Sequence, residues 1–188
     1  MKLFYSFFMW ILILIQFQCD SDKTISNKDP KLVYSGEFLI YDGKKFTGIL
    51  ETKLDAVGIT RKTPYVDGKM DGTEVEMYSG KKNSAERSFF QGKKIGIHRG
   101  WYENGQRRFQ YSYKDGELHG DVWEWHHTGT LVTLAKFWNG QLLGKKVWRP
   151  DGQIYSNFVM HGNRPVGLPG AKLCWQVRSD TNEKTKSF

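Results

Sequence analysis

Cysteine, proline and long hydrophobic runs are scarce in this chain of 188 residues. It has two Cys and five Pro, and two Cys cannot form the several bridges of a disulfide-dense scaffold. The longest hydrophobic run, Leu3 to Phe17, covers 15 residues and includes Ser6 and Gln16, whereas a membrane-spanning helix needs about 20. These shortages exclude a disulfide-stabilised mini-protein and a multi-span membrane protein.

Glycine and aromatic residues are abundant instead. The chain has 20 Gly, and 15% of its residues are aromatic, whereas Gly averages roughly 7% in proteins. Many glycines and aromatics with little proline favour short strands joined by tight turns. Helix formers do not dominate the composition, which argues against a helical bundle, and 39% hydrophobic residues argue against intrinsic disorder.

The N-terminal segment has the pattern of an export signal. Lys2 precedes the apolar run, whose length suits the hydrophobic region of a signal peptide. The run ends at Gln18-Cys19 and is followed by a polar stretch that reaches Pro30. A Cys in this position resembles the bacterial lipoprotein signal. The resemblance implies that residues 1–18 are a removable signal helix, that Cys19 is lipidated, and that residues 19–30 form a polar tether to a membrane of the bacterial cell envelope.

Two alternatives stay open for this segment. The lipoprotein family prefers Leu three residues before the Cys and a small residue directly before it, and Gln16 and Gln18 occupy these positions here. A single uncleaved N-terminal membrane anchor and an ordinary secreted protein therefore also fit the sequence. The formal net charge is +8. For an exported protein the available anions are lipid headgroups, glycans and acidic proteins, so we expect no nucleic acid partner.

Glycine recurs through the body of the chain with a period of about 24 residues. The first column follows a polar residue at Gly43, Gly68, Gly92, Gly116, Gly140 and Gly162. The second column comes four or five residues later, at Gly48, Gly72, Gly96, Gly120, Gly144 and Gly167. The third column closes another turn, at Gly58, Gly80, Gly105, Gly129 and Gly152. Three columns that keep the same step indicate a repeat protein.

Each unit is predicted to be a hairpin. Pairs such as Asp115-Gly116 favour tight turns, because Gly adopts positive φ without a Cβ clash. Between turns, aromatic and polar residues alternate at Phe109, Tyr111 and Tyr113, which places three rings on one face of a strand. The sequence therefore predicts an all-β fold, an elongated single-layer antiparallel meander of about five stacked hairpins.

The unit carries the motif Asn-Gly-x-x-x-Gly-x-x-x-x-Trp-x-x-x-Gly, seen from Asp115-Gly116 through Gly120 and Trp125 to Gly129. Related runs cover residues 92–105 and 140–152. This motif resembles the MORN family of repeats, in particular its bacterial variant, over residues 40–167. The resemblance implies an elongated, twisted sheet of stacked hairpins. We expect this domain to fill residues 31–178, with end caps at 31–40 and 173–177 and a flexible tail at 179–188.

No catalytic motif is recognisable in the sequence. His126 and His127 are neighbours on a predicted strand and so point to opposite faces, which disfavours a shared metal ion. Glu74 and Glu76 share one strand face, and we interpret them as solvated surface. Cys174 is interpreted as a small residue of the terminal covering strand. We therefore expect no enzyme activity, no metal and no cofactor.

Aromatic and basic residues provide the candidate binding sites. Trp101, Trp125 and Trp148 recur four residues before the third glycine. We expect them to stack across neighbouring hairpins, either as the packing of the sheet itself or as a strip that grips a glycan, peptide or acyl chain. Trp123 and Trp138 lie outside this column and are expected on the other face. The basic candidates follow the first glycine of successive units and are expected to form a row along one edge: Lys44, Lys69 and Lys93.

These features together predict a non-enzymatic, lipid-anchored scaffold or binding protein of the cell envelope. Its acyl chains would hold it in a membrane, and its partner would be a protein or another envelope component. The alternative comes from the family resemblance, because bacterial MORN-like proteins often carry an antitoxin label. That resemblance implies an antitoxin-like protein that neutralises a partner toxin by binding it.

Overall fold

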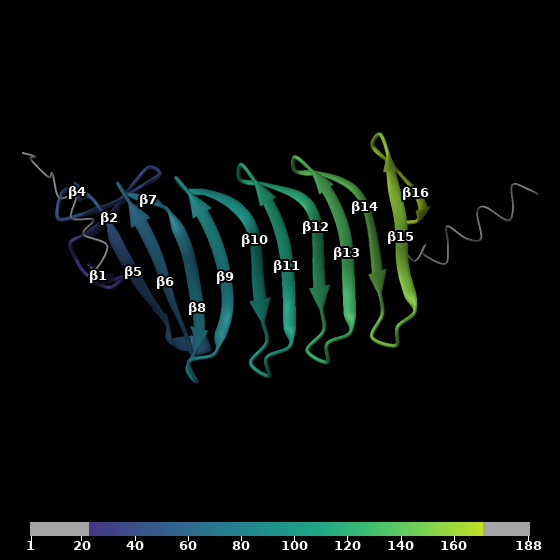
Figure 1. Ribbon diagram of the computed structural model, residues 1–188, viewed down its shortest axis with the longest axis horizontal. Coiled ribbons are helices and arrows are strands. Elements are labelled where there is room, and N and C mark those ends of the chain that lie inside the picture. Colours follow the sequence, from purple (N-terminus) through teal and green to yellow (C-terminus); the bar gives the residue numbers. More distant parts are fainter. Residues whose placement is uncertain (1–22, 171–188) are drawn as a thin grey trace, which may run out of the picture.

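The computed structural model describes residues 23–170 and shows an elongated, open β-sheet (Figure 1). The predicted signal, Cys19, the strand around Cys174 and the C-terminal tail lie outside the described residues. Thirteen strands form the main sheet, and a further three form a small separate sheet. Consecutive strands pair from β8 to β16, so the predicted all-β meander of hairpins is confirmed. Residues 23–170 contain no helix that could span a membrane.

The strands follow one another along the sheet in nearly the order of the sequence. The main sheet consists of β1 (Thr24–Ser26), β5 (Gly48–Leu54), β6 (Ile59–Val66), β7 (Lys69–Met70), β8 (Gly72–Tyr78), β9 (Asn83–Phe90), β10 (Lys93–Trp101), β11 (Arg107–Lys114), β12 (Glu117–Trp125), β13 (Leu131–Trp138), β14 (Gln141–Trp148), β15 (Ile154–His161) and β16 (Arg164–Leu168). The small sheet consists of β2 (Leu32–Ser35), β3 (Phe38–Tyr41) and β4 (Lys44–Lys45). A short 3-10 turn, Asp55–Val57, lies between β5 and β6.

The glycine columns mark two kinds of turn. At the upper edge in Figure 1, Asp115 and Gly116 both have positive φ, 52° and 95°, as a type I′ hairpin requires. At the lower edge Gly105 has a φ of 87°. The third column departs from prediction at one unit, because Lys81 adopts the left-handed conformation with a φ of 59° and Gly80 does not. The turn there is shifted by one residue relative to the glycine pattern.

The N-terminal end differs from the predicted single layer. Part of the predicted tether is strand β1, which pairs in parallel with β5 and buries Ile25. The small sheet does not cap the edge of β5 as expected. It forms a second layer, in which Leu39 of β3, together with Phe46 in the segment that follows β4, packs on Leu50 and Tyr65. These apolar side chains need cover that one layer cannot supply, because a lone sheet leaves both faces in water.

The two faces of the main sheet differ in character. Residues opposite each other in an antiparallel pair share a face, and the next residue along a strand belongs to the other face. One row runs through Tyr111, Val122, Ala135, Lys145 and Phe158 and defines the groove face. The other runs through Gln110, Trp123, Leu134, Lys146 and Asn157 and defines the aromatic face.

Candidate binding surfaces

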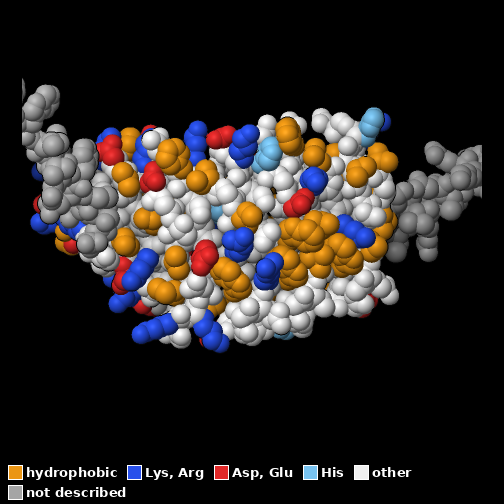
Figure 2. Space-filling model, viewed as in Figure 1, with side chains coloured by type: hydrophobic (Ala, Val, Ile, Leu, Met, Phe, Trp, Pro, Cys, Tyr) orange, Lys and Arg blue, Asp and Glu red, His pale blue; other side chains and the backbone are white. Residues whose placement is uncertain are grey.

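Hydrophobic side chains gather on the aromatic face over β12 to β15, as Figure 2 shows. Trp123 and Trp125 stack with ring centroids 6.2 Å apart and an angle of 10° between the ring planes. Leu134 lies opposite Trp123 on the neighbouring strand. Trp148 on β14 and Tyr155 on β15 continue the surface, because each lies two residues from Lys146 or Asn157, which pair on this face. We call these five residues the aromatic patch.

Three cations lie over rings of the aromatic patch. The Arg107 guanidinium is 6.0 Å from the ring centroid of Trp125, and the Lys146 ammonium is 5.1 Å from that of Trp148. Arg149 lies 5.5 Å from the ring of Tyr155. Such cation–π contacts attract each cation to the π face of its ring. The patch therefore combines apolar area with positive charge at defined positions.

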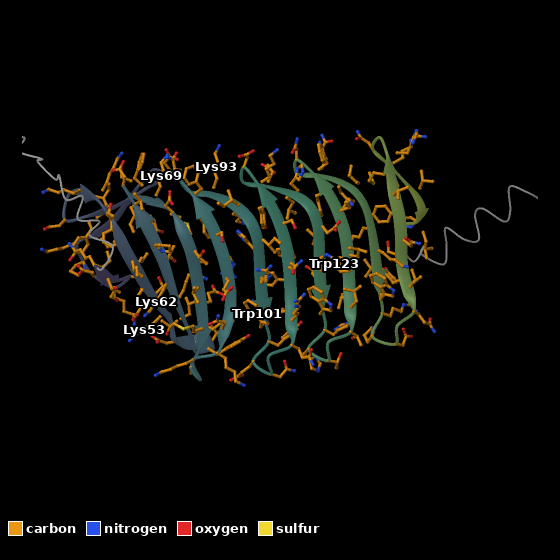
Figure 3. The ribbon with its side chains drawn as sticks, viewed as in Figure 1. Lys53, Lys62, Lys69, Lys93, Trp101 and Trp123 are labelled. Carbon is orange, nitrogen blue, oxygen red and sulfur yellow. The ribbon has the colours of Figure 1, made fainter. Side chains whose placement is uncertain are left out.

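The predicted column of tryptophans is placed on one face but does not stack on itself. Trp101, Trp125 and Trp148 end β10, β12 and β14, and β11 and β13 lie between these strands. Figure 3 shows Trp101 and Trp123 at separate places along the sheet. Strands two apart are separated by about 10 Å, so another residue, such as Leu131 opposite Trp125, intervenes. The expectation that Trp123 serves the other face is wrong, since it stacks on Trp125 two residues further along the same strand.

The groove face holds an apolar cavity of about 350 Å³ over β11 to β14. Tyr111, Val122 and Phe137 contribute apolar walls, and Glu124 and Lys145 contribute charge. The Tyr111 hydroxyl donates to Glu124 Oε1 at 2.7 Å. Burial and this hydrogen bond to a carboxylate raise the pKa of Tyr111 above its ordinary value, so the phenol stays protonated at neutral pH.

A buried ion network occupies the groove face between β6 and β9 and corrects our interpretation of Glu74 and Glu76. Their side chains are only 7% and 5% exposed, not solvated. Arg87 Nη1 contacts Glu74 Oε1 at 2.8 Å and Glu76 Oε1 at 3.1 Å, and Arg61 Nε donates to Glu76 Oε1 at 2.7 Å. Thr63 Oγ1 donates to Glu74 Oε2 at 2.9 Å. Arg61 of β6 and Arg87 of β9 thus neutralise the two carboxylates of β8, which lies between these strands. The alternation of residues along one strand does not indicate such pairing between strands.

The pKa of Glu76 results from opposing effects. Burial by itself would raise the pKa of this carboxyl, but the hydrogen bonds and charges of Arg87 and Arg61 outweigh burial and hold the pKa below its ordinary value. Glu76 is therefore ionised at neutral pH. A carboxylate that already accepts from two guanidinium groups is poorly suited to abstract a proton, which supports a structural role.

The predicted lysine row is divided between two cavities. Lys69 and Lys93 lie at the same edge (Figure 3) and line one cavity of about 510 Å³ between the small sheet and the main sheet. Lys69 Nζ is 3.0 Å from Glu37 Oε1, so its charge is compensated. Lys44 lines a different cavity of about 320 Å³ beside Lys23 and Tyr41. The row is interrupted because β4 belongs to the small sheet, whereas β7 and β10 belong to the main sheet.

His98 is buried in the sheet, although the sequence did not indicate that this histidine is shielded from solvent. It is 2% exposed and lies between the rings of Phe89 and Tyr113, with centroid distances of 5.6 and 4.5 Å. Its Nε2 is 2.9 Å from the Ser88 carbonyl oxygen, so this nitrogen carries the proton and donates. Burial lowers the pKa of His98. Within residues 23–170 no three His, Cys, Asp or Glu side chains are grouped closely enough to hold a metal ion.

No model of a protein family matches this chain, and no curated protein gives a significant match. The resemblance to MORN repeats therefore stays a prediction from the glycine and tryptophan pattern. The open sheet of consecutive hairpins, with an aromatic face and a groove face, is what the structure establishes.

Proposed function

We propose that this protein is a non-enzymatic, lipid-anchored binding scaffold of a bacterial cell envelope, built of MORN-like repeats. The observation that carries the proposal is the aromatic patch, which combines Trp and Tyr side chains with cations that include two arginines. Trp, Tyr and Arg are the residue types that contribute most to binding energy at protein interfaces. A contiguous apolar surface of this kind on a soluble sheet is typical of an interaction site.

The arrangement of the chain supports an anchor at one end and a binding surface at the other. Cys19 precedes Thr24 by five residues, which reach at most about 18 Å when fully extended. An acyl group on Cys19 would therefore hold β1, the first edge of the sheet, close to the membrane. From β1 to β12 there are seven strand spacings, or about 34 Å. The aromatic patch thus begins well along the sheet from the anchored edge.

Cell fractionation with acyl-chain labelling tests the anchor. We expect the wild type to be labelled and membrane-bound, because several acyl chains bind a membrane almost irreversibly. Cys19→Ala should be unlabelled, whereas the matched variant Cys174→Ala should behave as wild type. If wild type and Cys19→Ala are both soluble and unlabelled in the cytoplasm, the proposal is overturned. The antitoxin-like alternative would then be the better hypothesis, and co-purification of a small toxin that the protein neutralises would support it.

A further inference from the structure

We infer that the aromatic patch docks an acidic polypeptide segment, which inserts apolar side chains between the rings and places carboxylates against the three flanking cations. This inference rests on the proposed scaffold function and names its partner by chemistry. The patch is Trp123, Trp125, Leu134, Trp148 and Tyr155, as defined above. It extends across four strands, β12 to β15, and therefore presents a broad surface.

The apolar part of the patch is suited to a partner that packs onto it. Its tryptophans are half-buried, and Tyr155 is 40% exposed. Trp123 and Trp125 lie nearly parallel to each other, so their orientation is fixed before a partner arrives. Aromatic side chains held in this way lose little conformational entropy on binding.

The charge of the patch selects an acidic partner. Arg107, Lys146 and Arg149 form no salt bridge with any carboxylate of residues 23–170. The acidic side chain on this face nearest in sequence to the patch, Asp121, is already 3.6 Å from Lys136. Three uncompensated cations that are fixed over rings favour carboxylates in the partner and disfavour cationic sequences.

Two other occupants fit the patch less well. A second copy in a symmetric dimer would bring the same three cations against this surface, because both subunits of a two-fold dimer use the same patch. A membrane surface favours projecting side chains that insert among lipids, whereas these tryptophans are half-buried and two of them stack on each other. An acidic segment of another protein satisfies both the apolar area and the charge.

Selection from a phage-displayed library of random dodecapeptides tests this inference. The target is the purified full-length chain in nanodiscs of phosphatidylcholine, whose headgroups carry no net charge and so do not compete for the cations of the aromatic patch. We expect enriched peptides that contain Asp or Glu together with Leu, Phe or Trp. Their affinity should fall at least about tenfold for Lys146→Glu and for Arg149→Glu, and it should weaken as salt concentration rises.

Lys145→Glu is the matched control. Lys145 adjoins Lys146 in sequence and has similar exposure, but it lines the cavity on the groove face, so this variant should bind as wild type. Arg149 is exposed directly after β14, where the turn to β15 begins, so its reversal should leave the thermal unfolding temperature unchanged. Failure to enrich any peptide, enrichment of peptides without acidic residues, or equal losses for Lys145→Glu and Lys146→Glu would overturn the inference.

Nanodiscs that contain anionic phosphatidylglycerol distinguish a lipid occupant. Peptide binding should persist in them, because the inferred surface is not bound to the membrane. The inference is wrong if these lipids displace the peptide from the wild-type protein and shift the tryptophan emission of the wild-type protein but not that of Lys146→Glu. In that case the patch docks on membranes. These readouts use purified protein, so their failure is distinguishable from a failure of the anchor, which the labelling of Cys19 in cells decides.

Discussion

Removing Arg87 from the buried ion network should lower the free energy of unfolding more than a typical single substitution does. Arg87 contacts both Glu74 and Glu76, with Nη–Oε distances of 2.8 to 3.2 Å. The substitution Arg87→Met keeps an unbranched apolar stem but removes the charge. Only Arg61, which is 36% exposed, would then face two carboxylates. One buried negative charge would be left without compensation.

Two estimates bound the magnitude. Removing one partner from a buried ion pair typically destabilises a protein by about 3–5 kcal/mol. The uncompensated carboxylate can also escape by binding a proton, and for an ordinary Glu pKa of about 4.3 this costs about 3.7 kcal/mol at pH 7. Protonation therefore limits the electrostatic part of the loss. We expect Arg87→Met to lower the free energy of unfolding by about 3–4 kcal/mol at pH 7 and by about 1–2 kcal/mol at pH 5.

The pH dependence of the wild type has the corresponding sign. Because the pKa of Glu76 is lowered in the folded protein, the unfolded chain binds the proton more readily. The stability from this carboxylate is therefore present above its ordinary pKa and is lost as pH falls through the lowered value. Arg87→Met removes the largest favourable charge effect on Glu76, so the variant should lose less stability on acidification than the wild type.

Urea unfolding followed by tryptophan fluorescence at pH 7 and pH 5 measures both quantities. A double variant, Arg87→Met with Glu74→Gln, leaves one carboxylate for Arg61 and should recover most of the loss. Destabilisation of less than about 1 kcal/mol at pH 7, or a loss that is equal at the two pH values, would refute the reasoning. The network would then behave as an exposed ion pair.

Three further predictions follow from the backbone and from His98. Lys81→Gly should raise the free energy of unfolding by about 1 kcal/mol, because Lys81 has a φ of 59°, which glycine adopts without a Cβ clash. Gly80→Ala lies at a turn position with open space around a Cβ and should change the free energy of unfolding little. Thermal melts of both variants measure these effects. Gly100→Ala should destabilise by about 1–3 kcal/mol, since a Cβ there lies 2.7 Å from Phe109 Cζ, and Phe109→Ala should relieve this clash in the double variant. Burial lowers the pKa of His98 below 6.5, so the unfolded chain binds the proton more readily and the free energy of unfolding should fall as pH drops below that value. A pH series of urea titrations measures this fall. His98→Phe should lack the part of it that His98 contributes.

Local pattern sufficed for the repeat and its turns. Glycine columns about 24 residues apart predicted hairpins, and Asp115-Gly116 has the positive φ values of a type I′ turn. Alternation predicted that Phe109 and Tyr111 share a face, and their rings stack at 4.7 Å. These features depend on residues near in sequence, for which φ preference and strand period are sufficient. The third glycine column failed at one unit because a turn can place its left-handed residue one position later, as at Lys81.

Partners from different strands could not be predicted from such patterns. Glu74 and Glu76 looked like solvated surface, and only the neighbouring strands brought Arg61 and Arg87 to them. The tryptophan column was found from its spacing, but the cation over one of its rings comes from another strand, since Arg107 of β11 lies over Trp125 of β12. Trp123 is different, because the two-residue period of a strand already places it on the same face as Trp125. Residues 24–41 show no period that separates a tether, an edge cap and a second layer.

The sequence by itself determined the β class, the hairpin period, most turn positions and the basic, aromatic composition. These follow from backbone preference and from the two-residue period of a strand. Only the tertiary structure decided which charges are buried, which rings and cations form one patch, and that a small sheet covers the N-terminal apolar cluster. Burial and pairing depend on strand register and on contacts between distant segments, which a single sequence does not encode locally.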